Sequence, residues 1–366
     1  MVAMKSVDSI NVSIICGGQS SEHAISIVSA QNVVRTLVQM SCSPEVIWID
    51  LSGQWWRLSS SSEFLEAGVQ TKEPLVLTPG CSSPWRTTST PSLVDVVFPL
   101  IHGETGEDGS LQGLLELLSV PYVGANLMSS AMCMNKDMAK RVLRAAALPT
   151  CDWFALSPSS RGNTSFESLA SQWGEVLFVK PACQGSSFGV SRVTDANGFN
   201  RALDLAFQYD DGVLVEPAMK GVEIECSVRG YGSDLTASIP GELDVHHDFY
   251  SFDAKYNDQH GATAIVPARL NAQQETAVQQ LALAACRALQ VEGMARVDFF
   301  VSDERIVINE INTIPGFTEI SLYPRNWQAS GLSMEQLIQD HIVSAIRYFE
   351  QRKKTHISTS DTIKKD

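Results

Sequence analysis

Short apolar runs and amphipathic stretches alternate along the first third of the chain. Runs rich in Val, Ile and Leu predict strands, and apolar residues at helical spacing predict helices between them. The predicted strands are residues 10–18, 45–51, 93–103 and 120–126, and the predicted helices are residues 20–40 and 111–119. The strongly apolar run at 93–103 is typical of a buried parallel strand. We therefore predict an open parallel α/β domain over residues 1–124. Residues 52–92 are rich in Ser, Thr, Gly and Pro, and the serine run at 59–62 predicts a loop.

The pattern changes after residue 124. Residues 125–220 predict a smaller α+β unit, and residues 221–350 predict mainly strands, followed by a hairpin and a final helix. The predicted helices are residues 135–148, 195–209, 272–290 and 333–352, and the predicted strands lie within residues 175–193, 212–219, 223–232, 235–243 and 295–312. The last residues, 351–366, are predicted to form a flexible tail.

Composition limits the class of protein. The chain has 366 residues, of which 44% are hydrophobic and 19% charged, as expected of packed soluble domains. A formal net charge of -14 disfavours nucleic acid and anionic membranes as partners. We expect no signal peptide, and no apolar run reaches the ~20 residues that span a bilayer. The eight cysteines are scattered without a CxxC pair, which predicts free thiols and a cytoplasmic location.

The hairpin predicted at 295–312 carries candidate metal ligands. Glu310 and Asn312 are two residues apart and share one face of the second strand, and Asp298 lies on the first strand. A turn centred on Glu304 would place Asp298 directly opposite Glu310, and the side-chain oxygens would then suit Mg²⁺. A register shifted by one residue would turn Asp298 away, and the acids would form a solvated strand end.

Two further patterns favour contacts with anions. Lys180 ends a predicted strand, and a Gly- and Ser-rich loop follows, in which backbone amides and Ser186 could bind a phosphate. Because the lysine precedes the loop, the pattern differs from the Walker motif, and an ordinary hairpin turn remains the alternative. Arg296 shares the strand face of Asp298, so it could pair with the acids or face a substrate with developing negative charge.

Other charged residues are ambiguous by themselves. Lys136 begins a predicted helix, and Glu216 and Glu223 lie on predicted strands, where surface residues are also common. Glu22 follows the first strand at a loop tip, where a carboxylate could hold an ammonium group. His102 ends a buried strand, at the sheet edge where ligands tend to bind in α/β proteins. The adjacent glycines after the first strand lack the GxGxxG spacing, which disfavours NAD(P) binding and an oxidoreductase.

Five motifs follow one another along the chain: GGQSSEHAISIVSA, HGETGEDGSLQG, KPACQGSSFGV, FDAKY, and ARVDFF with NEINTIPGFTEISLYP. Together they resemble the D-alanine–D-alanine ligases of the ATP-grasp superfamily. The similarity covers about residues 11 to 350, nearly the whole chain. It implies an α/β ATP-grasp fold with three domains: an open parallel α/β domain at 1–124, a central α+β lid domain at 125–220, and a C-terminal α+β catalytic domain at 221–350.

The resemblance implies a site for ATP and metal. The implied ATP-binding residues are Lys136, Lys180, Ser186, Glu216 and Glu223. The lysines would contact the phosphates, Glu216 would face the adenine and Glu223 the ribose. The implied ligands of two Mg²⁺ ions, with Mn²⁺ as an alternative metal, are Asp298, Glu310 and Asn312.

The resemblance also implies sites for two amino acids. Glu22 would bind the ammonium group of the first D-alanine, with His102 nearby. Arg296 and the Gly316 amide would hold the oxyanion of the reacting carbonyl. The implied ligands of the second substrate's carboxylate are Lys255, Ser321 and the amide of Leu322.

The reaction implied by the resemblance is the ATP-driven synthesis of D-alanyl-D-alanine, a peptidoglycan precursor. The first D-alanine would form an acyl phosphate, and the amine of the second would displace phosphate. The polar stretch 250–268 suits a mobile lid that excludes water, and Ser186 and Tyr256 would link it to Glu22. The family includes relatives that use D-lactate or D-serine as the second substrate, and Tyr256 is typical of the D-alanine enzymes.

The resemblance predicts D-alanine and ATP as small-molecule partners and a homodimer as the assembly. A nucleotide-binding regulator that keeps the fold but lacks turnover is the alternative from a different class. Such a protein would lack Arg296, a metal-binding acid or Tyr256. All of these are present, so we expect an enzyme.

Overall fold

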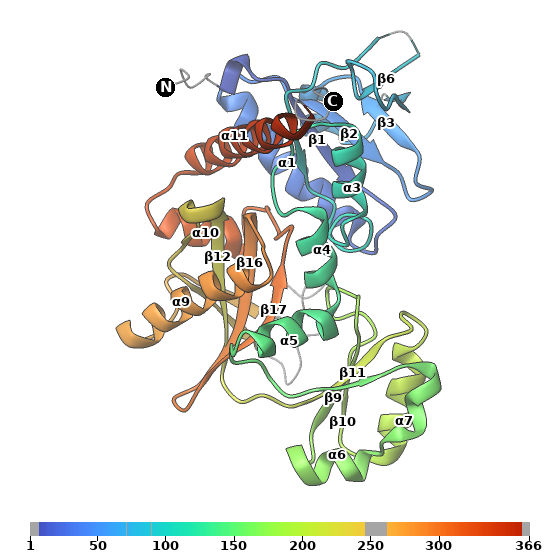
Figure 1. The fold of residues 1–366 in the computed structure, drawn as a ribbon, viewed down its shortest axis with the longest axis vertical. Coiled ribbons are helices and arrows are strands. Elements are labelled where there is room, and N and C mark those ends of the chain that lie inside the picture. Colours follow the sequence, from blue (N-terminus) through green and yellow to red (C-terminus); the bar gives the residue numbers. More distant parts are fainter. Residues whose placement is uncertain (1–6, 71, 89, 246–261, 361–366) are drawn as a thin grey trace.

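The computed structural model describes residues 7–70, 72–88, 90–245 and 262–360 of the chain. The N-terminal elements lie at the top of Figure 1, the C-terminal elements in the middle, and the elements around β9–β11 at the bottom. The final helix returns to the top and packs beside the first helix. The predicted α/β fold class is confirmed by this mixture of sheets and covering helices.

The N-terminal sheet has the strand order β4-β3-β2-β1-β7. Its strands are β1 (Val12–Gly17), β2 (Glu45–Ile49), β3 (Trp55–Leu58), β4 (Lys72–Pro74) and β7 (Val96–Pro99). Strands β1, β2 and β7 run parallel, as predicted, and helix α1 (His23–Gln39) connects the first two. Strands β3 and β4 extend the sheet in antiparallel fashion. Both β1 and β7 are buried along their whole length, as their apolar sequence requires.

The prediction of a loop at the serine run 59–62 is wrong, and regular elements form in the surrounding segment 52–92. Besides β3 and β4, this segment forms helix α2 (Ser61–Ala67) and the paired short strands β5 (Val76–Leu77) and β6 (Trp85–Arg86). The serine run at 59–62 begins the helix, because the Ser60 hydroxyl accepts a hydrogen bond of 3.1 Å from the Glu63 amide. A cluster of serines that resembles a loop is therefore a helix cap.

Several other elements differ from the prediction. Residues 120–126, predicted as a strand, form within the described chain a single bridge between Tyr122 and Val97. The helices that were not predicted are α4 (Leu127–Met134), α6 (Phe166–Trp173) and α10 (Leu322–Ala329). Helix α11 (Met334–Ser360) extends into the segment predicted as a flexible tail. The remaining short helices are α3 (Ser110–Leu117) and the 3-10 turns Val7–Ser9, Pro158–Asn163 and Gly232–Asp234.

The central sheet is antiparallel and has the strand order β10-β9-β11-β8. Its strands are β8 (Phe154–Leu156), β9 (Leu177–Pro181), β10 (Ser191–Val193) and β11 (Val213–Pro217). Helices α6 and α7 (Ala196–Ala206) pack together, and Phe199 of α7 shares a separate hydrophobic core with Leu177 and Val215 of the sheet. Helix α5 (Lys136–Ala145) precedes this unit in the sequence.

The C-terminal sheet has the order β15-β14-β12-β16-β17, with β13 paired to β12. Its strands are β12 (Val222–Gly230), β13 (Thr236–Ala237), β14 (Gly241–Val245), β15 (Ala262–Ile265), β16 (Gly293–Val301) and β17 (Ile306–Asn312). Helix α9 (Ala272–Ala288) shares a core with Ile224 and Val228 of β12. Helix α10 contacts the other face, where Asn326 donates to Ser227. The alternation of residues along β12 therefore places helices on both faces of the sheet.

A second core joins the N-terminal sheet to the end of the chain. Phe98 of β7 and Ile342 of α11 belong to the same buried cluster as Phe317, which lies in the turn after β17. The rings of Phe98 and Phe317 meet edge to face, with centroids 5.6 Å apart. The turn that follows the candidate metal ligands is therefore packed against the N-terminal sheet.

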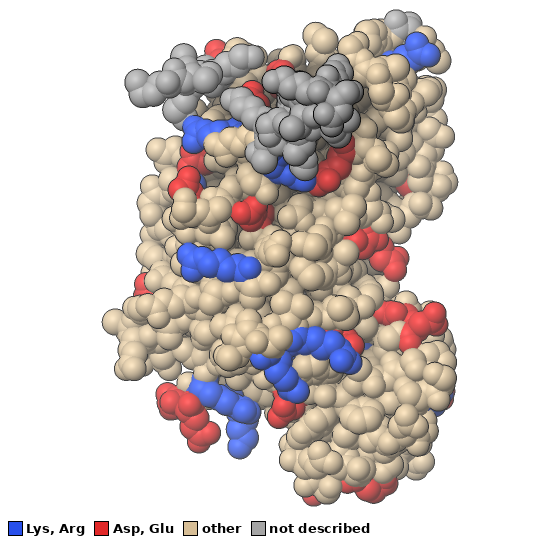
Figure 2. Space-filling model, viewed as in Figure 1, with Lys and Arg blue, Asp and Glu red and all other residues tan. Residues whose placement is uncertain are grey.

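The surface has both signs of charge. On the face drawn in Figure 2, acidic and basic side chains are interspersed over a surface that is mostly uncharged. None of the helices in the described part of the chain is both long and apolar enough to cross a membrane.

Candidate active site

A β-bulge brings the candidate metal ligands together. Near the turn, the ladder of β16 and β17 has a register in which Asp298 would face Asn309 and point away from Glu310. The register shifts by one residue between Asp298 and Phe299, so Asp298 faces Glu310 instead. The predicted pairing of Asp298 with Glu310 is observed, but its cause is the bulge and not a turn centred on Glu304.

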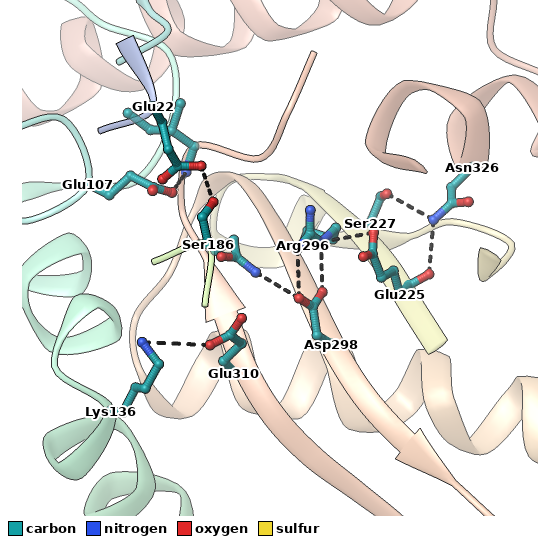
Figure 3. Close-up of polar contacts among 12 residues, drawn as sticks. Glu22, Glu107, Lys136, Ser186, Glu225, Ser227, Arg296, Asp298, Glu310 and Asn326 are labelled. Carbon is teal, nitrogen blue, oxygen red and sulfur yellow. Dashed lines mark hydrogen bonds and ion pairs between the residues drawn. The ribbon is translucent and has the colours of Figure 1, made fainter. Parts of the chain in front are cut away.

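Arg296 lies among these acids (Figure 3). Its Nε and one terminal nitrogen donate to the two carboxylate oxygens of Asp298, each at 2.7 Å, and its Nε lies 3.0 Å from Glu225 Oε2. Asn312 Nδ2 donates to Asp298 at 2.9 Å. Burial alone would lower the pKa of Arg296, but the charges of Asp298 and Glu225 outweigh burial and raise this pKa. A permanent cation is thus held beside the candidate metal ligands.

The oxygen atoms at this end of the hairpin fit a hard divalent cation. Asp298 and Glu310 are direct cross-strand neighbours, and Asn312 adds an amide oxygen from the same strand as Glu310. Among the described residues, no group of three or more His, Cys, Asp and Glu side chains could hold a metal by itself. An ion at this position would therefore take its other ligands from phosphate oxygens and water, as Mg²⁺ commonly does.

A group of three lysines faces the hairpin from α5 and the central sheet. Lys136, the first residue of α5, lies 3.8 Å from the carboxylate of Glu310. Lys180 of β9 and Lys140 of α5 both pair with Glu216 of β11, at 2.6 and 3.0 Å. Burial alone would raise the pKa of Glu216, but the two lysines outweigh burial and lower the pKa to about 2. Burial lowers the pKa of Lys136, and the charge of Glu310 opposes this effect.

The Gly- and Ser-rich loop after β9 reaches the N-terminal unit. The Ser186 hydroxyl donates a short hydrogen bond to the carboxylate of Glu22 (Figure 3). Ser186 and the next residue, Ser187, both have a positive φ, 47° and 61°, which is a strained conformation for residues with a side chain. Lys136 Nζ also donates to the Gln184 carbonyl at 2.6 Å. The loop is therefore held from two sides, by Glu22 and by Lys136.

Two side chains of the HGETGEDG segment, the buried His102 and the half-buried Glu107, connect this region to the turn after β17. His102 Nε2 lies 2.9 Å from the Ser29 hydroxyl, and His102 Nδ1 lies 2.9 Å from the Ile314 carbonyl oxygen. The Glu107 carboxylate accepts a hydrogen bond of 3.0 Å from the Ile314 amide. Burial, and then the charge of Glu22, raises the pKa of Glu107 to about 8. Burial lowers the pKa of His102, while the charge of Glu22 opposes that change.

The Pro-Gly turn is closed by the start of α10. A side chain at Gly316 would place its Cβ 2.8 Å from the Ser321 hydroxyl oxygen, so glycine allows the close approach. The Thr318 amide donates to the same hydroxyl at 3.1 Å. Leu322 is the first residue of α10, and its backbone amide therefore belongs to the helix N-terminus, where amides are free to bind anions. The structure thus places Gly316, Ser321 and Leu322 in one turn.

The remaining predicted residues lie on β12 or outside the described part of the chain. Glu223 lies on β12, opposite Phe300 in the ladder, two residues before Glu225. Lys255 and Tyr256 lie outside the described residues, as does most of the predicted lid at 250–268.

Comparison with known protein families accounts for this arrangement. The family model described as the D-ala D-ala ligase N-terminus matches residues 11–125, and the model described as the D-ala D-ala ligase C-terminus matches residues 142–343. The chain belongs to the D-alanine–D-alanine ligase family. The resemblance predicted from the five motifs is therefore confirmed, and with it the ATP-grasp fold of this ligase family.

Individual relatives of the ligase family agree over nearly the whole chain. The D-alanine–D-alanine ligase of Coxiella burnetii (strain RSA 493) is 44% identical over 359 residues, which cover 94% of this chain and 96% of the relative. The D-alanine–D-alanine ligase A of Escherichia coli O6:H1 is 41% identical over 348 residues, covering 91% and 94%.

Solved structures of the ligase family have the same fold. The D-alanine–D-alanine ligase structure from Coxiella burnetii superposes with a TM-score of 0.86 at 40% identity, covering 98% of this chain and 99% of its own. The VanG D-Ala:D-Ser ligase from Enterococcus faecalis superposes with a TM-score of 0.83 at 31% identity, covering 92% and 99%.

Three charged residues of the site were not singled out from the sequence. Glu107 is the second glutamate of the HGETGEDG motif, Glu225 follows Glu223 on the same strand face, and Lys140 lies one helical turn after Lys136. A period of two in a strand places Glu225 beside Glu223, and a period of about four in a helix places Lys140 beside Lys136. These spacings were the available signal for the two residues, whereas Glu107 lies in a loop without such a period.

Proposed function

We propose that this ligase-family chain joins two D-alanines to D-alanyl-D-alanine with ATP, releasing ADP and phosphate, and so supplies a peptidoglycan precursor. The observation that carries the proposal is the meeting of three groups of side chains. Glu22 with Ser186 and Arg296 with its acids lie close together, and Lys136, a member of the lysine group, reaches Glu310 beside them (Figure 3). The other two lysines, Lys140 and Lys180, pair with Glu216. Glu22 suits an ammonium, the lysines suit a set of phosphates, and Arg296 suits a developing oxyanion.

ATP would bind between the central and C-terminal sheets. Lys136 and Lys180 would contact the phosphates, since both ammonium groups lie near this boundary and point toward acids that phosphate oxygens can replace. Glu216 would face the adenine and Glu223 the ribose. The Ser186 loop, which the Lys136–Gln184 contact fixes, would add backbone amides to the phosphates.

Asp298, Glu310 and Asn312 would hold two Mg²⁺ ions, or Mn²⁺ in their place. The metal, when bound, supplies positive charge that offsets the charge of the transferring phosphoryl group. Arg296 donates to Asp298, and Lys136 lies 3.8 Å from Glu310, so each acid is held in place by a basic side chain that a metal ion would replace.

The first step would activate the first D-alanine. Glu22 would bind its ammonium group and His102 would lie nearby, buried between Ser29 and Ile314. The carboxylate oxygen would attack the γ-phosphorus of ATP, the bond to the leaving ADP oxygen would break, and an acyl phosphate would form. The contribution of the lysines is to position and neutralise the phosphates during this transfer.

The second step would form the peptide bond. The carboxylate of the second D-alanine would be held by Lys255, Ser321 and the Leu322 amide. Its amine would attack the acyl carbonyl, lose a proton, and displace phosphate. Arg296 and the Gly316 amide would stabilise the tetrahedral oxyanion, because both are held rigidly at the end of the hairpin.

A lid formed by 250–268, with Tyr256 linked to Ser186 and Glu22, would keep water from the acyl phosphate. We further propose a cytoplasmic homodimer. Both statements rest on the resemblance of the motifs to the ligase family.

D-Serine or D-lactate as the second substrate forms a second candidate function. The likeness to a D-Ala:D-Ser ligase at 31% identity favours D-serine over D-lactate as this alternative. Tyr256 favours D-alanine, as does the higher identity to ligases named for D-alanine alone.

The test is ADP release by the purified chain with Mg-ATP, combined with mass identification of the products. The mixtures contain D-alanine, L-alanine, D-alanine with D-serine, or D-alanine with D-lactate. We expect ADP and D-alanyl-D-alanine with D-alanine, and neither with L-alanine. If the main product contains D-serine or D-lactate, that compound and not D-alanine is the second substrate. ATP binding without ADP release in every mixture would indicate a non-catalytic regulator.

A further inference from the structure

Lys140 is the most deeply buried charged side chain of the site. It is 1% exposed, and its ammonium lies 3.0 Å from Glu216 Oε1, 2.7 Å from Cys151 Sγ and 3.4 Å from Thr150 Oγ1. Burial alone would lower its pKa, but the charge of Glu216 outweighs burial and raises the pKa. A lysine is rarely buried so completely, because removing its charge from water costs free energy. A buried group of opposite charge must offset that cost.

That group is Glu216, whose carboxylate is shared between two lysines. One oxygen pairs with Lys140 and the other with Lys180, at 3.0 and 2.6 Å. Lys140 is held by α5 and has no access to solvent, whereas Lys180 ends β9 just before the Ser186 loop. Only Lys180 is therefore placed to exchange Glu216 for an incoming anion.

The charge balance shows what Lys140 changes. With both lysines, the group carries two positive charges against one negative charge, so an excess of positive charge remains for a ligand. Without Lys140, Glu216 and Lys180 would form a neutral pair, and a phosphate would have to compete with Glu216 for the ammonium of Lys180. A phosphate that displaced Glu216 from Lys180 would then leave Glu216, which is 5% exposed, buried without a counter-charge.

We propose that Lys140 is a positioning residue for nucleotide binding: it keeps Glu216 neutralised, and thereby releases Lys180 to bind a nucleotide phosphate. Lys140 itself touches no ligand in this role. The inference rests on the proposed function, because it takes the Lys180 region as the phosphate site.

The experiment compares Lys140→Met with the unchanged chain. We expect the Kd for ADP, measured by calorimetry, and the KM for ATP to rise by roughly tenfold or more, the usual size for loss of a buried charged partner. The KM for D-alanine should change little. Lys140→Arg, which keeps the charge, should restore most of the nucleotide affinity.

Cys151→Ala is the matched control, because it removes another contact of Lys140 without removing charge. Its nucleotide affinity should equal that of the unchanged chain. A second comparison uses Glu216→Gln, in which no buried carboxylate needs neutralising. Adding Lys140→Met to the Glu216→Gln variant should change the Kd for ADP much less than Lys140→Met changes it in the unchanged chain. The double variant also leaves no buried carboxylate without a counter-charge.

The outcomes separate the possible explanations. An unchanged Kd for ADP in folded Lys140→Met would overturn the inference. A lower kcat, an equal rise of the KM for ATP and the KM for D-alanine, and a lower melting temperature would show a structural role and would also overturn the inference. Additive effects of Lys140→Met and Glu216→Gln on the Kd for ADP would overturn it as well. If the unchanged chain neither binds ADP nor releases it from ATP, the proposed function fails, and this inference with it.

Discussion

The two charged clusters on either side of the proposed nucleotide site have net charges of opposite sign. At the end of the β16–β17 hairpin, the carboxylates of Glu225, Asp298 and Glu310 surround Arg296. Around β9 and α5, by contrast, Lys140 and Lys180 both pair with one carboxylate, that of Glu216, and Lys136 adds a third positive charge at the start of α5. The first cluster has an excess of negative charge and the second an excess of positive charge.

The difference shows how the charges of a buried site are balanced within the protein. Each cluster neutralises part of its own excess, and the contact of 3.8 Å between Lys136 and Glu310 joins the two. In the acidic cluster, metal cations would replace the basic side chains as partners of the carboxylates. In the lysine cluster, phosphates would replace the carboxylates as partners of the lysines. Ligand binding then exchanges ion pairs instead of creating charge in a buried place.

Removing a carboxylate from the acidic cluster should have the largest effect. We expect Glu310→Gln to reduce turnover by roughly a thousandfold, because a metal ligand and the partner of Lys136 are lost together. ADP release measures turnover, and circular dichroism confirms folding. Glu304→Gln is the matched control, since it makes the same change at an exposed position on the same hairpin. Activity of Glu310→Gln close to that of the control would remove the metal-site proposal.

Removing the cation from the acidic cluster should act on the chemical step. We expect Arg296→Ala to lower kcat by roughly a hundredfold, and to change the Kd for ADP by less than about threefold, because its contact forms with the oxyanion. Steady-state kinetics and calorimetry give the two numbers. Arg305→Ala, at an exposed position of the same hairpin, is the control. A defect confined to nucleotide binding would contradict the oxyanion role.

The stability of the chain should depend on pH through Glu107, which lies near Glu22. The pKa of Glu107 is raised from 4.5 to about 8 in the folded chain, so the unfolded chain releases this proton at lower pH. The free energy of unfolding should therefore fall as pH rises between about 4.5 and 8, by up to about 1.4 kcal/mol per pH unit. Glu107→Gln should remove this contribution. Urea unfolding across this range measures the slope, and identical slopes in both proteins would refute the raised pKa.

The smallest effect is expected far from both clusters. Ser60→Ala removes the cap of α2 and should lower the free energy of unfolding by about 1 kcal/mol. Its kcat and both KM values should match those of the unchanged chain. A clear change in nucleotide affinity would show that general loss of stability disturbs the site, and would weaken conclusions from the other variants.

The sequence predicts the acidic cluster better than the lysine cluster, for a physical reason. Residues two apart on a strand share a face, so Glu310 and Asn312 could be placed together directly. Their register with Asp298 depends on a bulge that no local pattern specifies. The loop predicted at 59–62 was wrong because a serine run at a helix cap has the same composition as one in a loop. The pairing of Lys140 with Glu216 joins α5 to β11, a tertiary contact that spacing along the chain does not encode.

The packing of Phe317 has a genetic consequence. This residue follows Gly316 directly and shares its core with Phe98 of β7 and Ile342 of α11. Cavities at either position would loosen the turn that carries the proposed oxyanion amide. In a screen for loss of growth, we therefore expect damaging substitutions at β7 and α11, remote in sequence from every motif of the site.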